Sequence, residues 1–302
     1  MKASIPPTCR VIRNEPMSRH TSWRAGGCAA FYALPQTREA LQSLLHRIDK
    51  TEKIEWLGLG SNTLVRDGGF NGWIIATQHV MNDIHWLDNN RVYVGAGVAD
   101  AKLARMCQQK GLTGAEFFAG IPGLIGGALA MNAGAWGSDT WSHVINVETM
   151  NRQGEIRQRQ RDEFAVSYRH VGNRQGEWFI GATMQFDDNK NTAACDSNEV
   201  INIRQLLAQR ADSQPTGMAS CGSVFRNPDA DYAARLIESC GLKGKRSGGA
   251  VVSEKHANFI INDHHASAGD IESLIETIQQ TVQQQTGISL QTEVRIIGEQ
   301  AK

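Results

Sequence analysis

The sequence lacks an excess of charge of either sign. Its 302 residues include 31 Lys and Arg and 31 Asp and Glu, so the formal net charge at pH 7 is zero. Proteins dedicated to nucleic acid usually carry a basic excess, so the sequence predicts no nucleic-acid partner, although net charge does not describe local patches. Hydrophobic residues make up 41% of the chain. That share excludes a wholly disordered protein and favours about two globular domains.

Paired cysteines and a targeting segment are also lacking. None of the six cysteines has Cys-x-x-Cys spacing, so we expect free thiols in a reducing cytoplasm. The first twenty residues contain no apolar signal-peptide core. The uncharged stretch 117–138 is long enough to span a bilayer, but its six glycines, Pro122 and Asn132 leave too few large apolar residues. We therefore predict a Gly-rich ligand loop in a cytoplasmic protein with no membrane span.

Signatures of metal sites and common hydrolases are absent as well. No set of Cys and His residues has zinc-ligand spacing, and His264 and His265 lie in a polar stretch that is typical of a solvated loop. We therefore predict no metal site. Neither a GxSxG nor an HExxH motif occurs, so the sequence carries no standard hydrolase signature.

The spacing of apolar residues predicts helices mixed with short strands, the α+β class. Helices are expected after Pro35 and over residues 103–109, 200–209, 232–240 and 267–287, and strands over residues 54–57, 73–75, 91–94 and 290–297. The last helix has the clearest signals, because Ser267 is a good N-cap and Gly287 suits the left-handed residue that ends a helix. Residues 1–19 are expected to form a loose leader, and the polar run 187–191 to mark a domain boundary.

Glycines cluster in three places. Segments 58–63 and 95–100 each follow a predicted strand and begin Gly-x-Gly, but neither has the third glycine of a Rossmann fingerprint. Each of these two, taken alone, is more often a tight turn than a ligand site. The longer cluster, 120–137, is stronger evidence, because glycines let the backbone approach a pyrophosphate and turn N–H groups toward it. It predicts a dinucleotide ligand, and a Gly-rich packing turn is the alternative.

The order of short motifs along the chain says more about its family than composition does. The sequence resembles the UDP-N-acetylenolpyruvoylglucosamine reductase (UDP-N-acetylmuramate dehydrogenase) family over about residues 20–298. The motifs that carry the resemblance are 57–65, 68–72, 116–123, 126–127, 132–134, 167–169, 222–228, 241–244, 248–250, 256–260 and 292–294. No insertion separates Ser167-Tyr168-Arg169 from Gly222, which is typical of the family's shorter subtype.

The resemblance implies a fold and a domain order. We expect an FAD-binding region of the p-cresol methylhydroxylase/vanillyl-alcohol oxidase type and a C-terminal α+β substrate-binding domain. The expected boundaries are a leader over 1–19, an FAD-binding domain over 20–187 with subdomains 20–80 and 81–187, and a substrate-binding domain over 198–302. Such a fold binds FAD with Gly-rich loops of a different pattern, which explains why the Rossmann fingerprint is absent.

The resemblance also implies a reaction. NADPH reduces non-covalently bound FAD, and the flavin then reduces UDP-N-acetylglucosamine enolpyruvate to UDP-N-acetylmuramate. The expected protein is a cytoplasmic flavoprotein oxidoreductase of peptidoglycan synthesis, and so of cell wall biogenesis, cell shape and cell division.

Three residues match the family's catalytic positions. Hydride transfer to the vinyl carbon leaves negative charge at the carbon that bears the carboxylate, and Arg169 is the matched cation to stabilise it. Ser223 is the matched proton donor to that carbon. Glu293 is expected either to stabilise the developing acid, if itself protonated, or to orient a proton-relay water. Without the resemblance, an ion pair would explain Arg169 and Glu293, and a turn hydroxyl would explain Ser223.

Further positions match the family's ligand contacts. Those expected to bind FAD are Gly58, Leu59, Gly60, Ser61, Asn62, Thr63, Gly120, Ile121, Pro122, Gly123, Gly126, Gly127, Asn132 and Gly134. Those expected to contact the substrate are Tyr168, Arg210, Asn227 and Arg295, for which ordinary surface charge or polarity is the alternative. Trp136 stands where the family commonly has Tyr and is expected to alter flavin packing.

Two other functions are compatible with the same glycines. One is a different FAD-dependent oxidoreductase of this fold, acting on an alcohol or lactone, which would have no reason to keep the Ser223 and Glu293 motifs. The other is a nucleotide-binding module without catalysis, which would bind a ligand but transfer no electrons. A Rossmann dehydrogenase is a poorer third, because the third glycine is missing twice.

Overall fold

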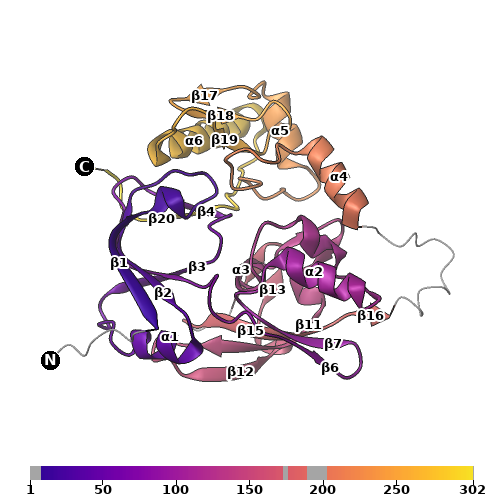
Figure 1. The fold of residues 1–302 in the computed structure, drawn as a ribbon. Coiled ribbons are helices and arrows are strands. Elements are labelled where there is room, and N and C mark those ends of the chain that lie inside the picture. Colours follow the sequence, from indigo (N-terminus) through magenta and orange to yellow (C-terminus); the bar gives the residue numbers. More distant parts are fainter. Residues whose placement is uncertain (1–7, 173–175, 189–202, 302) are drawn as a thin grey trace. The chain divides into compact units, whose positions relative to one another are not determined.

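The computed structural model describes residues 8–172, 176–188 and 203–301 (Figure 1). The chain divides into two compact units. Unit 1 takes Met1–Val11, Ala33–Gly58 and Ile75–Gln209, and unit 2 takes Ile12–Tyr32, Leu59–Ile74 and Arg210–Lys302. Each unit is therefore assembled from three separate stretches of chain. The linear domain boundaries expected from the sequence stay a prediction.

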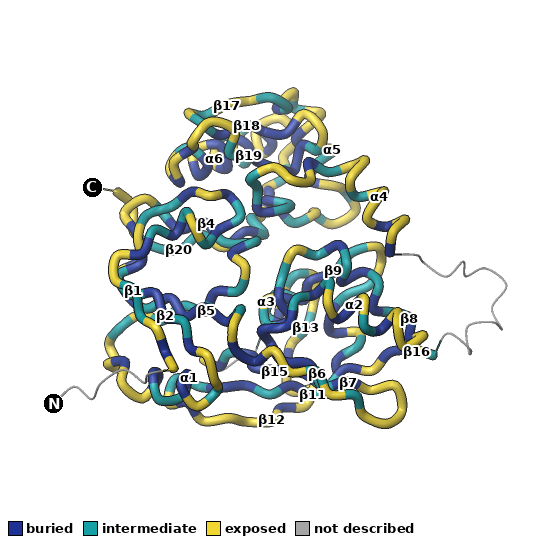
Figure 2. Tube along the Cα trace, viewed as in Figure 1, coloured by how far each residue is buried: buried dark blue, intermediate teal, exposed yellow. Residues whose placement is uncertain are grey.

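Unit 1 contains a five-stranded antiparallel sheet in the order β12-β11-β15-β7-β6. Its strands are β6 (Ile84–Leu87), β7 (Arg91–Gly95), β11 (Val144–Met150), β12 (Ile156–Gln160) and β15 (Trp178–Gln185). Val94 and Val147 both pair with Ala182, and all three are fully buried. The central strand β15 is mostly buried, whereas the edge strand β12 is mostly exposed (Figure 2).

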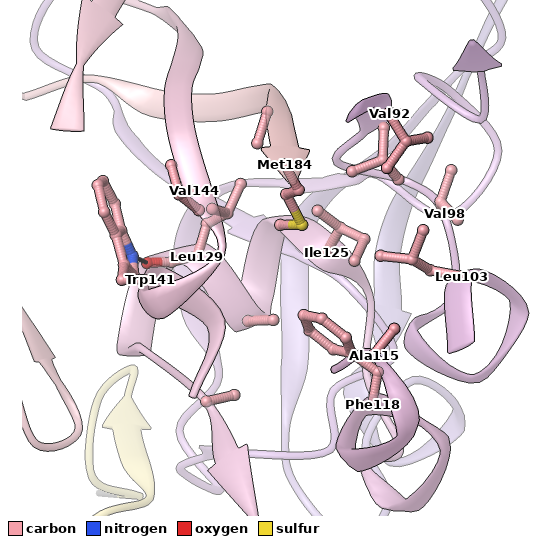
Figure 3. Packing of buried hydrophobic residues seen from close by; sticks show 14 of the residues in the cluster. Val92, Val98, Leu103, Ala115, Phe118, Ile125, Leu129, Trp141, Val144 and Met184 are labelled. Atoms are coloured by element: carbon pink, nitrogen blue, oxygen red, sulfur yellow. Dashed lines mark hydrogen bonds between the residues drawn. The ribbon is translucent and has the colours of Figure 1, made fainter. Parts of the chain in front are cut away.

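Two helices contribute to the core of unit 1. They are α2 (Asp100–Gln109) and α3 (Ile125–Met131), and Leu103 and Ile125 are each 0% exposed. Figure 3 shows these side chains packed with Val92, Trp141 and Met184. The indole nitrogen of Trp141 donates to Leu129 O at 2.8 Å, which satisfies the polar atom of the largest side chain in this core.

The remaining elements of unit 1 are short. They are α1 (Arg38–Leu45), β3 (Lys53–Leu57), the pairs β8 (Leu112–Thr113) with β16 (Asp187–Asp188), β9 (Gly134–Ala135) with β10 (Ser138–Asp139) and β13 (Val166–Ser167) with β14 (His170–Val171), and the 3₁₀ turns Glu116–Gly120, Thr140–Ser142 and Arg161–Glu163. Strand β3 belongs to a four-stranded sheet in the order β1-β2-β5-β3. Its other strands, β1 (Cys9–Pro16), β2 (Cys28–Pro35) and β5 (Phe70–Ala76), each have residues in both units.

Unit 2 is built around the long helix α6 (Ala268–Thr286). The apolar stripe of α6 is buried through Ile271, Leu274, Ile275, Ile278 and Val282. It contributes to a core with β18 (Ala250–Val252), β19 (Ile260–Asn262) and α5 (Ala233–Ser239). Strand β17 (Arg246–Ser247) pairs with β18. Strand β4 (Thr63–Val65) pairs in parallel with β20 (Arg295–Ile297), and the turn Met17–Arg19 is 3₁₀. Helix α4 (Ile203–Ser213) begins in unit 1 and continues into unit 2 from Arg210.

The ends of α6 confirm the sequence-based prediction. Asp270 N donates to the Ser267 hydroxyl at 3.0 Å, and Ser267 N donates to the Asp270 carboxylate at 2.9 Å. This reciprocal cap satisfies two N–H groups that the helix cannot pair internally. Gly287 ends the helix with φ 75°, the left-handed conformation that glycine adopts without strain.

Three sequence-based expectations were wrong in detail. Residues 9–19 are not a loose leader, because they form β1 and a 3₁₀ turn. The predicted Gly-rich loop 117–138 contains helix α3, since the run from Ile125 to Met131 closes helical hydrogen bonds despite two glycines. The predicted strand 290–297 is a strand only over Arg295–Ile297. Residues 200–202 of the predicted helix and 189–191 of the predicted boundary lie outside the described residues.

Within residues 8–172, 176–188 and 203–301, no helix has both the length and the apolar character needed to cross a membrane.

Candidate active site

Two Gly-rich segments of unit 1 run antiparallel to each other. Asp100 N donates to Gly123 O at 3.1 Å, Ile125 N to Val98 O at 2.9 Å and Gly126 N to Ala96 O at 2.9 Å. A Cβ at Gly126 would lie 3.0 Å from the Ala96 Cβ, so this glycine allows α3 to pack closely on Ala96. The first N–H groups of α3 are thereby used inside the protein.

Gly127 differs from its neighbours. No atom lies within 4 Å of the position where its Cβ would stand, and its φ is not left-handed. Neither internal packing nor backbone conformation therefore accounts for this glycine. A smooth, open backbone surface at the start of α3 fits a dinucleotide, which tolerates no bulk where its phosphates approach the chain.

Asn132 and Gly134 follow α3 and are held by internal contacts. Asn132 ends the helix in the left-handed conformation and is 2% exposed. Its amide donates to Ser167 O at 3.2 Å, and its carbonyl accepts from Trp141 N at 3.0 Å. A Cβ at Gly134 would lie 2.4 Å from Ser138 O. The described contacts of these two residues fix the segment that follows α3.

Arg169 lies in the turn between β13 and β14, where Ser167 pairs with His170. Its φ is 53°, a left-handed conformation that is uncommon for a residue with a side chain. The guanidinium donates to Gly134 O at 2.6 Å and stands 5.0 Å from the ring centre of Tyr168. Tyr168 is 52% exposed. The turn therefore presents Tyr168 to solvent and ties Arg169 to the segment after α3.

The first Gly motif is divided between the units. Gly58 belongs to unit 1 and residues 59–63 to unit 2. A Cβ at Gly60, whose φ is 64°, would lie only 2.1 Å from His20 O. Ser22 N also donates to Gly60 O at 3.0 Å. The loop is thus fixed against segment 20–22, where any side chain at position 60 would collide.

Ser223 and Glu293 lie on paired segments of unit 2. Phe225 and Thr292 form an antiparallel bridge, and Glu293 N donates to Val224 O at 2.8 Å. The amide of Asn62 donates to Glu293 O at 3.1 Å. The main chain of Glu293 is therefore bonded to the residue that follows Ser223 and to the side chain of Asn62 in the first Gly motif.

Asn258 holds the Ser223 segment in place, and sequence reasoning did not assign it a role. Its side chain accepts from Phe225 N at 2.9 Å and donates to Phe225 O at 2.8 Å, and it is 3% exposed. Val224 N also donates to Asn258 O at 2.9 Å. The signal in the sequence that points to Asn258 is motif 256–260, which contains it.

The predicted substrate contacts have different surroundings. Asn227 is exposed, and its side chain accepts from Ala233 N at 3.1 Å near the start of α5. Arg295 is exposed at the start of β20. Arg210 is partly buried in α4, and desolvation lowers the pKa of its guanidinium. A cation in a poorly solvated position favours an anionic ligand.

The predicted residues thus fall into two groups. Gly58, the FAD-binding positions from Gly120 to Gly134, Tyr168 and Arg169 belong to unit 1, and Leu59–Thr63, Arg210, Ser223, Asn227, Glu293 and Arg295 belong to unit 2. Their roles stay predictions. Among the residues that the structure describes, no three His, Cys, Asp or Glu side chains gather closely enough to hold a metal ion.

The chain matches two protein-family models. Residues 29–159 match an FAD binding domain, and residues 214–297 match the C-terminal domain of UDP-N-acetylenolpyruvoylglucosamine reductase. These matches confirm the FAD prediction and the predicted combination of an α+β FAD-binding region with a C-terminal domain.

Similar proteins cover nearly the whole chain. UDP-N-acetylenolpyruvoylglucosamine reductase of Legionella pneumophila (strain Corby) is 52% identical over 291 residues, which are 96% of this chain and 92% of the relative. The enzyme of the same name from Alkalilimnicola ehrlichii is 50% identical over 285 residues, 94% of each chain. The crystal structure of UDP-N-acetylenolpyruvylglucosamine reductase from Thermus caldophilus has a TM-score of 0.77 and 27% identity, covering 95% of this chain and 98% of that one.

Proposed function

Because the chain belongs to the UDP-N-acetylenolpyruvoylglucosamine reductase family, we propose that it reduces UDP-N-acetylglucosamine enolpyruvate to UDP-N-acetylmuramate, with NADPH as the source of electrons. The observation that carries the proposal is the identity of 52% over 96% of the chain. The reaction belongs to peptidoglycan precursor synthesis, and we propose a cytoplasmic location for it.

The residues present fit FAD. When bound, FAD would accept hydride from NADPH and deliver it to the vinyl carbon of the substrate. We propose that the Gly-rich segments 58–63 and 120–134 hold the cofactor. The open backbone at Gly127 and the fixed loop at Gly60 support that assignment, because both present main chain without side-chain bulk.

Arg169 is proposed to stabilise the negative charge that develops beside the substrate carboxylate. A guanidinium is always charged, and its planar fork suits a carboxylate. The bonds to Gly134 O and Asn132 O support this role, because a side chain fixed in advance loses little freedom in the transition state. The left-handed backbone of Arg169 costs about 1–2 kcal/mol relative to a relaxed turn.

Ser223 is proposed to donate the proton that completes the reduction. A hydroxyl is a weak acid, but a carbanion is a strong enough base to take its proton if the two are held together. The clamp that Asn258 places on Phe225 supports this role by fixing the segment that carries Ser223. Gly222 precedes Ser223 with φ 72° and no atom near its Cβ position.

Glu293 is proposed either to stabilise the developing acid, if protonated, or to orient a proton-relay water. Its main chain is tied on both sides, by Val224 O and by the Asn62 amide. Tyr168, Arg210, Asn227 and Arg295 are proposed substrate contacts. Of these, Arg210 is supported by its desolvated position, which favours the diphosphate of the substrate.

The test is an anaerobic absorption spectrum of the purified protein during two additions. NADPH should bleach the flavin bands, and UDP-N-acetylglucosamine enolpyruvate should then restore them. Bleaching without recovery would contradict the proposed substrate and indicate another acceptor. Absence of flavin even after reconstitution with FAD would contradict the proposal as a whole.

A further inference from the structure

Asp100 is a buried carboxyl group that the roles proposed above do not use. It is the first residue of α2, it is 0% exposed, and neither carboxyl oxygen has a hydrogen-bond partner among the described residues. Burial raises its pKa well above the ordinary value, because a low-dielectric environment disfavours the charged form. Burial thus favours the neutral acid, and its proton has no acceptor among the described residues. Unpaired buried groups are rare in folded proteins and call for a specific cause.

The carboxyl group lies directly against the predicted FAD loop. A Cβ at Gly123 would stand 2.5 Å from Asp100 Oδ2, and Asp100 N donates to Gly123 O at 3.1 Å. Position 123 must be glycine as long as Asp100 keeps this place. Both residues fall inside the segment that matches an FAD binding domain.

The surroundings of Asp100 are uncharged. Segments 95–99 and 120–124 contain no titratable residue. The titratable residues of α2 are Asp100 itself, Lys102, Arg105 and Cys107, and the 3₁₀ turn Glu116–Gly120, which packs on α2, adds Glu116. Desolvation is the cause of the raised pKa, with no contribution from a charged neighbour among the described residues. Asp100 is thus the titratable group that contacts the loop at Gly123.

We propose that Asp100 is a positioning residue for the FAD loop, and that FAD binding gives its carboxylic acid proton an acceptor among the backbone carbonyls of segment 120–123. Protein atoms cover Asp100 completely, and the loop contacts it directly at Gly123, so we place the acceptor in the loop. The neutral acid then fixes the loop in its FAD-bound conformation. The inference rests on FAD binding by this chain, which the proposed function also requires.

Because the Asp100 carboxylic acid holds its proton more tightly when FAD is bound, the affinity of the protein for FAD depends on pH. Affinity should be constant below the pKa that Asp100 has in the free protein. Above it, affinity should fall about tenfold per pH unit until the pKa of the bound state is reached. Binding in that range should take up one proton.

The experiment is a titration of flavin-depleted protein with FAD, followed by flavin fluorescence over a range of pH. Asp100→Asn keeps the shape and an N–H donor but cannot ionise, so its affinity should not depend on pH in this way. Asp88→Asn is the matched control, because Asp88 is an exposed carboxylate of the same unit, and it should behave as wild type. A wild-type profile in Asp100→Asn, or a flat profile in wild type, would overturn the inference.

A second measurement covers the case in which Asp100→Asn does not fold. Infrared difference spectra of wild-type protein labelled with ¹³C-aspartate should show a carboxylic-acid carbonyl band that shifts when unlabelled FAD binds. An unchanged band would overturn the inference while leaving the proposed function intact. Wild-type protein that binds no FAD would overturn both.

Discussion

The two hydrogen bonds between the Asn258 side chain and the Phe225 main chain give a prediction that separates an effect on stability from an effect on catalysis. Asn258→Ala leaves two buried backbone groups, Phe225 N–H and Phe225 C=O, without their partner. Each unsatisfied group costs about 1–3 kcal/mol, and water that enters the space left by the side chain recovers part of this. We therefore expect a loss of about 2–4 kcal/mol in the free energy of unfolding.

The same change should act selectively on one half-reaction. Because Asn258 fixes the segment of Ser223, Asn258→Ala should leave flavin reduction by NADPH close to wild type and slow flavin reoxidation by the substrate. Stability would be measured by urea unfolding, and the two half-reactions by anaerobic stopped-flow absorbance.

Asn262→Ala is the matched control. Asn262 also bonds two backbone groups of unit 2, donating to Trp23 O at 2.8 Å and accepting from Ala266 N at 2.8 Å. It should destabilise the protein comparably and leave the ratio of the two half-reactions unchanged. The reasoning is refuted if Asn258→Ala costs less than about 0.5 kcal/mol, a value typical of plain surface changes, or if both variants alter the half-reactions alike.

Three further outcomes follow from the structure. Ser223→Ala should slow flavin reoxidation but not flavin reduction, and Ser223→Cys should recover part of the rate; equal losses in both half-reactions would contradict the assigned role. The Ser267 N–H lowers the pKa of Asp270, so the stabilisation is present at neutral pH and lost as pH falls through that lowered pKa; Asp270→Asn should flatten acid unfolding curves. Burial raises the pKa of Cys107 and Cys221 to about 12, so mass mapping at pH 8 should find maleimide on exposed Cys28 before it appears on either of these two cysteines.

Local signals explain what the sequence predicted well. Helix α6 carries its cap, its apolar stripe and its terminating glycine within about twenty consecutive residues, and each acts through neighbours along the chain. The apolar runs of the sequence predict strands within β3, β5 and β7, and the structure confirms them. Such features depend little on the rest of the fold.

The errors have a non-local cause. Leu290 and Val294 look like strand residues and are buried, but the segment between them pairs with 222–226, nearly seventy residues away along the chain, through an isolated bridge. Helix α3 was missed because Gly126 and Gly127 lower helix propensity, whereas the packing of Gly126 on Ala96 favours the helix in the folded protein.

In the candidate site, too, some residues could be predicted from the sequence and one could not. Motif order predicted Arg169, Ser223 and Glu293 as candidates, and their joint role stays a prediction. No pattern in the sequence distinguishes Asp100 from the many aspartates that open a helix on the protein surface. Its lack of a partner arises from burial beneath segments that fold over it, which sequence spacing does not record.

The interleaved course of the chain through unit 2 has a consequence for its synthesis. Trp23 and Leu64 belong to the same buried cluster as α6, and the Trp23 indole nitrogen donates to Ile260 O across 237 positions of sequence. At roughly 5–20 residues per second, a ribosome makes the intervening chain in some tens of seconds. During that interval the early apolar residues have no core to enter, so newly made chains should depend on chaperones until the last hundred residues emerge. A fragment that begins near residue 198 would in turn lack Trp23 and Leu64 and could not complete this core by itself.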